Sequence, residues 1–300
     1  MSAHVPVLLT EVLALLRPGP SGRVLDATVG LGGHAEALLE AMGPAGSLLG
    51  MDRDAEALAL AAERLARFGE RVRLVQGRYE HLADLIEPGE SFDGILFDLG
   101  ASSLQLDSAA RGFAFGREGP LDMRMNQGAG ETAAELVARL PEQELADLIF
   151  RWGEERGSRR IARAIVGARR AGPIETTTAL AGIVARAIPR RAWPRYIHPA
   201  TRTFQALRIA VNDELAGLGS ALEEAAARLR PGGRIAVISF HSLEDRIVKQ
   251  TWRALSASGP RRILTKRPVT AGDAEVAGNP RARSAKLRVL ELAPQALEVA

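Results

Sequence analysis

The stretch VLDATVGLGGHAEALLEAMGPAGSLLGMD, residues Val24–Asp52, decides the fold of this chain. Its first apolar residues predict a short buried strand, which a glycine-rich turn and a helix follow. A second apolar strand then ends at an acidic residue, Asp52. Strand, glycine turn, helix and strand, with an acid closing the second strand, is typical of a nucleotide-binding βαβ unit.

The spacing of glycines and acids favours one class of ligand. Gly30, Gly32 and Gly33 form G-x-G-G, which departs from the dinucleotide pattern. Asp52 follows Gly32 by about 20 residues, where an acid accepts hydrogen bonds from a ribose. Asp26 precedes the glycines, and its charge would repel a pyrophosphate. The ammonium and ribose of S-adenosylmethionine both need acceptors, so we expect this methyl donor. A tight turn that binds no ligand is the alternative.

Composition narrows the class of protein. The chain has 300 residues, 46% of them hydrophobic, which allows one large domain or two ordinary ones. It has no cysteine, no apolar run of membrane-spanning length and no export signal, so we expect a cytoplasmic protein. Only three of its 39 basic residues are lysines, and arginine pairs well with phosphate. A GC-rich genome would explain the same arginine bias.

The order of the expected elements predicts an α/β protein with a helical insertion. Strands alternate with helices on both sides of the insertion, which predicts a parallel sheet whose ligands bind at the carboxyl ends of its strands. We expect strands at 23–27, 47–51, 72–76, 92–98, 234–240 and 287–292. We also expect a short helix that Thr10 caps and that ends at Leu16, and one long helix over 203–229. Only helical periodicity occurs between 132 and 188. The predicted domains are 1–105 with 200–300, and an inserted helical domain at 106–199.

Residues at the ends of two predicted strands are candidates for catalysis or substrate binding. Asp98 ends the predicted strand 92–98, where it could accept the hydrogens of an exocyclic amine during methyl transfer. Its alternative roles are to cap the next segment or to hold the donor. His241 follows the strand 234–240 and could touch the substrate, or it could only bond the backbone.

Clustered arginines predict contact with RNA. Trp193, Tyr196 and Phe204 are interleaved with arginines, Arg202 among them, and Arg281 and Arg283 form a further group. Planar side chains among basic groups suit base stacking and phosphate contact. Ordinary solvated helix faces, paired with nearby glutamates, are the alternative explanation.

Together, these motifs resemble one family, the bacterial small-subunit rRNA cytosine-N4 methyltransferases (RsmH, also called MraW). The matching blocks cover nearly the whole chain in the family's order: residues 4–9, 32–34, 52–54, 98–103, 119–125, 153–156, 198–206, 239–246 and 279–284.

The resemblance implies a Rossmann-like class I methyltransferase sheet with an inserted all-helical domain. It also implies transfer of a methyl group from S-adenosylmethionine to the exocyclic N4 of a cytidine near the ribosomal decoding site. By analogy, Gly32, Gly33 and His34 would hold the donor, Asp52 its ribose, and Tyr79 would lie by the adenine. Asp98 and Gln105 would complete the pocket.

Other functions stay open at this point. They are methylation of another nucleic acid or a protein, a nicotinamide-dependent oxidoreductase, and a non-catalytic RNA-binding module. No spacing of acids and histidines demands a metal. The partner would be small-subunit rRNA, within an assembled or nearly assembled subunit. The oligomeric state is open, a homodimer included.

Overall fold

The computed structural model describes residues 5–294 and divides the chain into two compact units. Among these residues, the sheet unit consists of 5–100 and 215–294, and the helical unit of 101–214. Each unit has its own apolar core.

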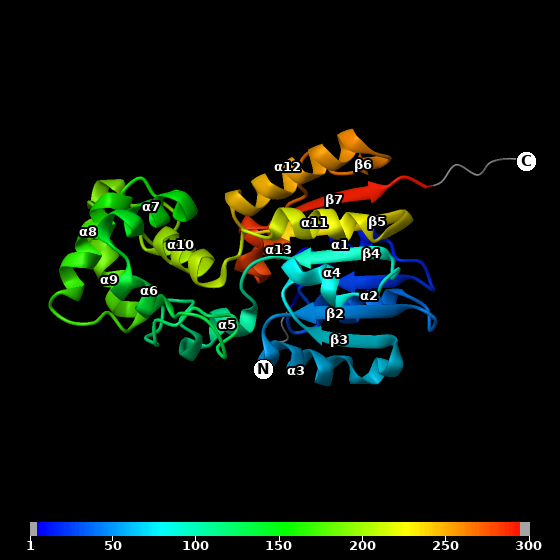
Figure 1. The fold of residues 1–300 in the computed structure, drawn as a ribbon, viewed down its shortest axis with the longest axis horizontal. Helices are drawn as coiled ribbons and strands as arrows, with labels where there is room; N and C mark the ends of the chain where they lie inside the picture. Colours follow the sequence, from blue (N-terminus) through cyan, green and yellow to red (C-terminus); the bar gives the residue numbers. More distant parts are fainter. Residues whose placement is uncertain (1–4, 295–300) are drawn as a thin grey trace, which may run out of the picture. The chain divides into compact units, whose positions relative to one another are not determined.

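The sheet unit contains a seven-stranded mixed sheet with the strand order β3-β2-β1-β4-β5-β7-β6 (Figure 1). Neighbours from β3 through β5 are parallel, whereas β7 pairs antiparallel with both β5 and β6. A parallel sheet core with helices on both faces is Rossmann-like, so the predicted α/β fold class is confirmed. The strands are β1 Arg23–Asp26, β2 Ser47–Asp52, β3 Val72–Gln76, β4 Phe92–Asp98, β5 Leu229–Ser239, β6 Arg261–Ile263 and β7 Lys286–Leu292.

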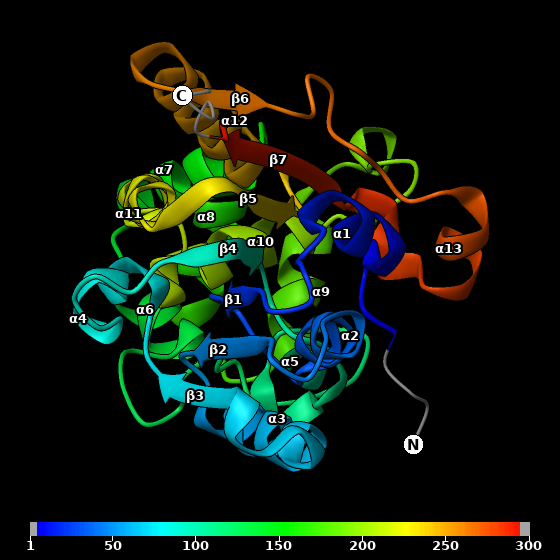
Figure 2. The same cartoon turned by 90° about the vertical axis from the view of Figure 1, so that its right-hand side faces the viewer.

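Alternating side chains of the strands build a core on each face of the sheet. Val24 and Leu96 point into one core, and their neighbours Leu25 and Phe97 into the other, as the two-residue period of a strand requires. Figure 2 shows α1, α2 and α13 on one side, with α4 and α11 on the other. The helices of this unit are α1 Leu9–Leu16, α2 Gly33–Ala41, α3 Ala55–Leu65, α4 Leu82–Leu85, α11 Leu218–Ala227, α12 Ser242–Ser258 and α13 Asp273–Gly278, with 3₁₀ turns at Ala66–Arg71, Tyr79–His81 and Pro280–Ser284.

The helical unit packs around buried side chains from several helices and from the loop before them. Leu145, Ile161, Leu180 and Phe204 belong to this core. The unit comprises α5 Ser103–Asp107, α6 Ala133–Arg139, α7 Glu142–Gly153, α8 Ser158–Arg169, α9 Thr177–Ala187 and α10 Thr201–Asn212, with 3₁₀ turns at Ala109–Arg111 and Arg190–Ala192.

Three local predictions were wrong. The sheet is not wholly parallel, because β7 returns antiparallel beside β5. The long helix expected over 203–229 is two helices, since the chain turns at Asp213, whose φ is 52°. Leu8 rather than Thr10 precedes the first helix.

The boundaries of the units also differ from the predicted ones, 105/106 and 199/200. Helix α10 belongs to the helical unit because Phe204 and Leu207 are buried in that core. Gln205 also donates a hydrogen bond from Nε2 to the carbonyl oxygen of Trp152 on α7, at 2.9 Å. Sequence periodicity identifies a helix but not the core in which its apolar face is buried.

Within residues 5–294, no helix is both long enough and apolar enough to cross a membrane.

Candidate functional site

The turn between β1 and α2 is shaped by glycines and tied to the neighbouring strand. Gly30 and Gly32 have φ values of 52° and 77°, a region that glycine adopts without strain. Val29 donates its N–H to the carbonyl oxygen of Met51 at 2.7 Å, and Gly30 donates to Oδ2 of Asp52 at 2.8 Å. The turn therefore holds backbone against the end of β2, as predicted for a nucleotide site.

The first residue of α2 has no space for a side chain. A Cβ atom on Gly33 would lie 2.6 Å from Cγ of Pro6. The segment before α1 therefore packs directly on the start of α2, and glycine at this position allows that approach.

Asp52 organises the end of β2. Besides the bond from Gly30, its Oδ1 accepts from the backbone N–H of Asp54 at 2.9 Å, and Asp54 in turn caps α3. Burial raises the pKa of Asp52, although these backbone hydrogen bonds oppose the shift. A carboxylate has about four lone-pair positions, more than these backbone N–H groups occupy, so Asp52 can accept a further hydrogen bond, from a ribose hydroxyl for example.

Asp26, at the end of β1, is almost completely buried, with 1% of its surface exposed. Its Oδ1 accepts a hydrogen bond from the N–H of Thr28 at 3.2 Å. Burial, together with repulsion from Asp52, raises the pKa of Asp26 to about 7. Such a carboxyl gains from any cation brought close to it.

Asp98, at the end of β4, is positioned by groups from two other elements. Its backbone N–H donates to Oγ1 of Thr28 at 2.6 Å, and its Oδ2 lies 3.5 Å from Nδ1 of His34 on α2. Burial, with repulsion from Asp26 and Glu244, raises the pKa of Asp98 well above its usual value. Its Oδ1 is buried and, among residues 5–294, has no hydrogen-bond partner.

Tyr79 lies after β3, in the 3₁₀ turn Tyr79–His81. Its ring meets Phe97 edge to face, with the centroids 5.9 Å apart and an interplanar angle of 70°. This contact fixes the orientation of a half-buried ring in the sheet unit.

The structure thus brings most of the predicted cofactor residues together at the carboxyl ends of the parallel strands in the sheet unit. Gln105 is the exception, because it lies in the helical unit. Its Oε1 accepts from the N–H of Ser102 at 2.9 Å, and its own N–H donates to Oγ of Ser102 at 3.3 Å, which forms a capping box for α5. Its part in a cofactor pocket stays a prediction.

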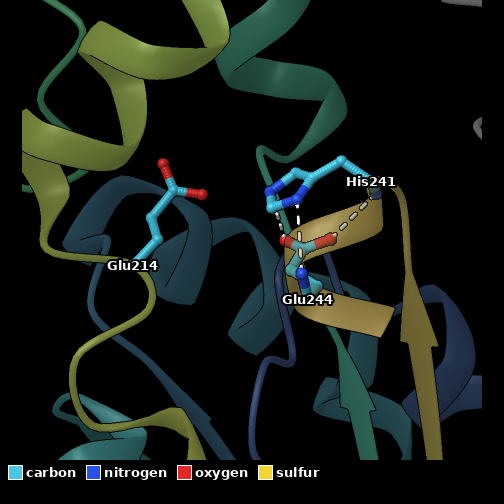
Figure 3. A group of neighbouring side chains, drawn as sticks. All are labelled: Glu214, His241 and Glu244. Carbon is cyan, nitrogen blue, oxygen red and sulfur yellow. Dashed lines mark hydrogen bonds and ion pairs between the residues drawn. The ribbon is translucent and has the colours of Figure 1, made fainter. Parts of the chain in front are cut away.

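His241 caps α12, as one of the two interpretations predicted. Its Nδ1 accepts from the N–H of Glu244 at 3.4 Å, and its Nε2 lies 3.2 Å from Oε1 of the same residue (Figure 3). Both ring nitrogens therefore face Glu244 on α12, the helix that His241 caps. An RNA contact through His241 stays a prediction. Glu214, also drawn in Figure 3, belongs to the helical unit and ion-pairs with Arg208 at 2.8 Å.

The predicted RNA contact through Phe204 is wrong, because this side chain is in a core. It is only 4% exposed, and its ring meets Phe115 with the centroids 4.7 Å apart. A stacked base needs a free aromatic face, which Phe204 lacks. Arg202 is half-exposed and donates to the carbonyl oxygen of Glu154 at 3.3 Å.

The other predicted RNA residues lie on the sheet unit, in the 3₁₀ turn Pro280–Ser284 before β7. Arg283 is exposed and Arg281 is half-buried, and Ala282 between them packs into the core. Ala282 therefore faces the core while the guanidinium of Arg283 is accessible to solvent. Contact of Arg281 or Arg283 with RNA stays a prediction.

Sequence reasoning missed how Thr28 and His34 support Asp98. Both contacts join residues more than 60 positions apart in the chain, so no local pattern indicates them. The only available signal was that Thr28 follows the predicted strand 23–27 and that Asp98 ends the predicted strand 92–98.

These observations fit a methyl donor that carries an ammonium, a sulfonium and a ribose. Asp26, Asp52 and Asp98 all present acidic groups, and the buried Oδ1 of Asp98 is an acceptor that an N–H group would satisfy. Positive charge is favoured beside such groups, and a pyrophosphate would be repelled.

Comparison with known proteins decides the family. The chain matches the MraW methylase family over residues 1–293. It belongs to the MraW methylase family. A relative named "Ribosomal RNA small subunit methyltransferase H" from Geobacter sulfurreducens is 55% identical, and the alignment covers 96% of this chain and 98% of that protein. A relative of the same name from Sorangium cellulosum is also 55% identical, over 95% of this chain and 89% of that protein. As a member of the MraW family, the chain is a methyltransferase.

Proposed function

We propose that this protein methylates the exocyclic N4 of a specific cytidine in small-subunit rRNA, near the decoding site. It is an rRNA methyltransferase whose methyl donor is S-adenosylmethionine. One observation supports the choice of an amine as acceptor. The buried Oδ1 of Asp98 has no hydrogen-bond partner among residues 5–294, and a nucleophile that carries N–H groups would satisfy it.

When bound, S-adenosylmethionine supplies a methyl group on a positively charged sulfur. The chain's own residues then have three tasks. Asp52 holds the ribose from the end of β2, and the glycine turn lets backbone approach the donor closely. Asp98 accepts hydrogen from the cytosine amine as its nitrogen turns pyramidal, which keeps the nitrogen aligned with the methyl carbon. Asp26, when it is ionised, adds negative charge close to Asp98.

The chemistry also requires the base to leave its stack, because a cytosine amine in a helix cannot reach the strand ends. RNA must therefore be held in an open form. We propose that the arginine surfaces of the protein do this by binding phosphate groups and unstacked bases.

The segment Pro189–Pro199 of the helical unit, named here the basic aromatic segment, supports such a role. The guanidinium of Arg190 lies 4.3 Å from the centroid of Trp193, and that of Arg195 lies 5.4 Å from the centroid of Tyr196. Tyr196 is 76% exposed, the largest value among the exposed large hydrophobic side chains of residues 5–294. An exposed ring beside a cation suits a base stacked against a nearby phosphate.

The reaction is tested with S-adenosylmethionine labelled in its methyl group. Naked rRNA and small ribosomal subunits are assayed side by side, and the product is digested to nucleosides and analysed by mass spectrometry. We expect labelled N4-methylcytidine at one position. A label on another base, or none while the donor still binds, would refute the proposal.

The part played by Asp98 is tested with Asp98→Asn. The amide cannot accept the proton, so we expect a loss of about 10²–10⁴-fold in single-turnover rate. Asp93→Asn is the matched control, since Asp93 lies on the same strand at its opposite end and bonds to Arg23 and Arg230. Its rate should stay within about 2-fold of the wild type. Equal rates for the two variants would remove Asp98 from the mechanism.

The basic aromatic segment is tested by RNA binding. We expect Tyr196→Ala to weaken binding by about 1–3 kcal/mol, the value of one base–aromatic stack. Phe150→Ala is the control, because Phe150 is another exposed aromatic residue of the helical unit, at 60% exposure. If both substitutions weaken binding equally, the segment is not a specific contact.

We further propose that the substrate is an assembled or nearly assembled small subunit rather than free rRNA. A faster reaction on subunits than on naked rRNA would support this, and the reverse would contradict it.

Sedimentation of the purified protein will decide between a monomer and the homodimer that the sequence left open. A cytoplasmic location stays a prediction. Binding of a nicotinamide cofactor with no methyl transfer would instead support the oxidoreductase alternative.

A further inference from the structure

The two ring nitrogens of His34 have distinct partners. Nε2 lies 2.9 Å from the carbonyl oxygen of Val7, which can only accept, so Nε2 carries a hydrogen. In a neutral ring Nδ1 then bears a lone pair, and this atom lies 3.5 Å from Oδ2 of Asp98. Two lone pairs facing each other repel, so one proton is required between His34 and Asp98.

The surroundings would otherwise leave that proton on Asp98. Burial raises the pKa of this carboxyl well above its usual value, and the charges of Asp26 on β1 and Glu244 on α12 raise it further. A protonated Asp98 cannot take a second proton from a substrate amine. Methyl transfer therefore needs a group that removes the proton already bound to Asp98 before Asp98 can accept one from the substrate amine.

We propose that His34 is a positioning residue for Asp98. Its Nδ1 takes the proton from Oδ2 and leaves Oδ1 as the oxygen that receives the proton of the cytosine amine. The proposal rests on the proposed function, and it assigns the side chain of His34 a role other than holding the donor. The bond from Nε2 to Val7 fixes the ring so that only Nδ1 can face Asp98.

The proton balance of the step is complete. The cytosine N4 lone pair forms the bond to the methyl carbon, and the bond from that carbon to sulfur breaks with its electrons going to sulfur. N4 loses one proton to Oδ1 of Asp98, while His34 keeps the proton it already holds. Asp98 and His34 then share two protons, and one passes to water after the product leaves.

The pair can be tested without substrate by ¹⁵N NMR of the histidine rings in the free protein. We expect Nε2 of His34 to stay protonated while Nδ1 titrates. Asp98→Asn removes the carboxylate that favours the imidazolium form, so it should lower the pKa of His34 by about 1 unit or more. If Nε2 is unprotonated, or if the His34 titration is the same in Asp98→Asn, the proposal is overturned.

A second test uses the pH dependence of single-turnover methyl transfer in His34→Asn. An amide cannot take up a proton, so Asp98 must be deprotonated by solvent alone. We expect the variant to lose at least about 10-fold in rate at pH 7 and to recover toward pH 9, with donor affinity within about 3-fold of the wild type. No loss, or a loss equal at every pH, would overturn the proposal.

The two tests separate this inference from the proposed function. Absence of rRNA methylation by the wild-type enzyme would refute the proposed function, whereas the NMR titration decides the His34–Asp98 pair by itself. His81→Asn serves as the matched control for the kinetic test, because His81 lies in the same unit at the end of the Tyr79–His81 turn. We expect its pH profile to match that of the wild type.

Discussion

Replacing Asp26 with asparagine should make the protein more stable at neutral pH while weakening its binding of the methyl donor. Asp26 is 1% exposed, and burial raises its pKa from 3.8 to about 7. The amide oxygen of asparagine can still accept the hydrogen bond from Thr28. The substitution therefore removes a titratable group with little change in packing.

The sign of the effect follows from proton linkage. Between about pH 4 and pH 7 the folded protein keeps a proton on Asp26 that the unfolded chain has lost. The folded state binds more protons, so the contribution of Asp26 to stability falls as the pH rises through this window. A rise from 3.8 to about 7 corresponds to about 4 kcal/mol at about 1.4 kcal/mol per pH unit, an upper bound because water can enter a relaxed site.

Urea denaturation of the wild type and of Asp26→Asn at several pH values between 4 and 8 measures this effect. We expect the difference in the free energy of unfolding between the variant and the wild type to grow by about 1–4 kcal/mol, in favour of the variant, as the pH rises. Calorimetry should show donor affinity reduced by about tenfold or more, the value of a hydrogen bond to a charged group.

Asp245→Asn is the control of opposite sign. The ion pair with Arg288, at 2.6 Å, lowers the pKa of Asp245, so this carboxylate stabilises the fold above its unfolded pKa. The variant should lose stability at pH 7 and much less near pH 3. A stability difference between the wild type and Asp26→Asn that does not change with pH would refute the reasoning.

Three further predictions follow from single contacts. Phe204→Ala should lower the free energy of unfolding by about 3–5 kcal/mol in denaturant titration, because the ring is 4% exposed, and a loss below about 1 kcal/mol would contradict its burial. Gly33→Ala should cost about 1–3 kcal/mol by the same measurement, and Pro6→Ala should relieve that cost, since the new Cβ would lie 2.6 Å from Cγ of Pro6. Arg195→Gln should reduce the salt dependence of RNA binding by about one counterion, and an unchanged slope would exclude a phosphate contact.

Much of the sheet unit could be predicted from the sequence because its signals are local. An apolar run followed by glycines and a helix identifies β1 and α2, and β3 and β4 have the predicted bounds. Parallel strands place their carboxyl ends at one edge, so Asp52 and Asp98 were expected in one site from their positions alone.

The pairing of α10 with its core could not be predicted from sequence spacing. Residues 203–229 have one continuous helical pattern, yet the chain turns at Asp213 and the two halves bury their apolar faces in different cores. Phe204 was predicted to stack on a base because it lies close to Arg202 in the sequence, and the spacing does not show that its ring is buried in a core. Composition shows that a ring is present, and only packing shows whether its face is free.

The sequence by itself determined the βαβ unit, the acids at the strand ends and the resemblance that identified the family, because each depends on residues close together in the chain or on the order of motifs along it. Only the tertiary structure decided that β7 runs antiparallel beside β5, that Phe204 is buried, and that Val7 and His34 support Asp98. These features depend on contacts between distant segments, and their energies are set by burial and hydrogen-bond partners that exist only after the chain has folded.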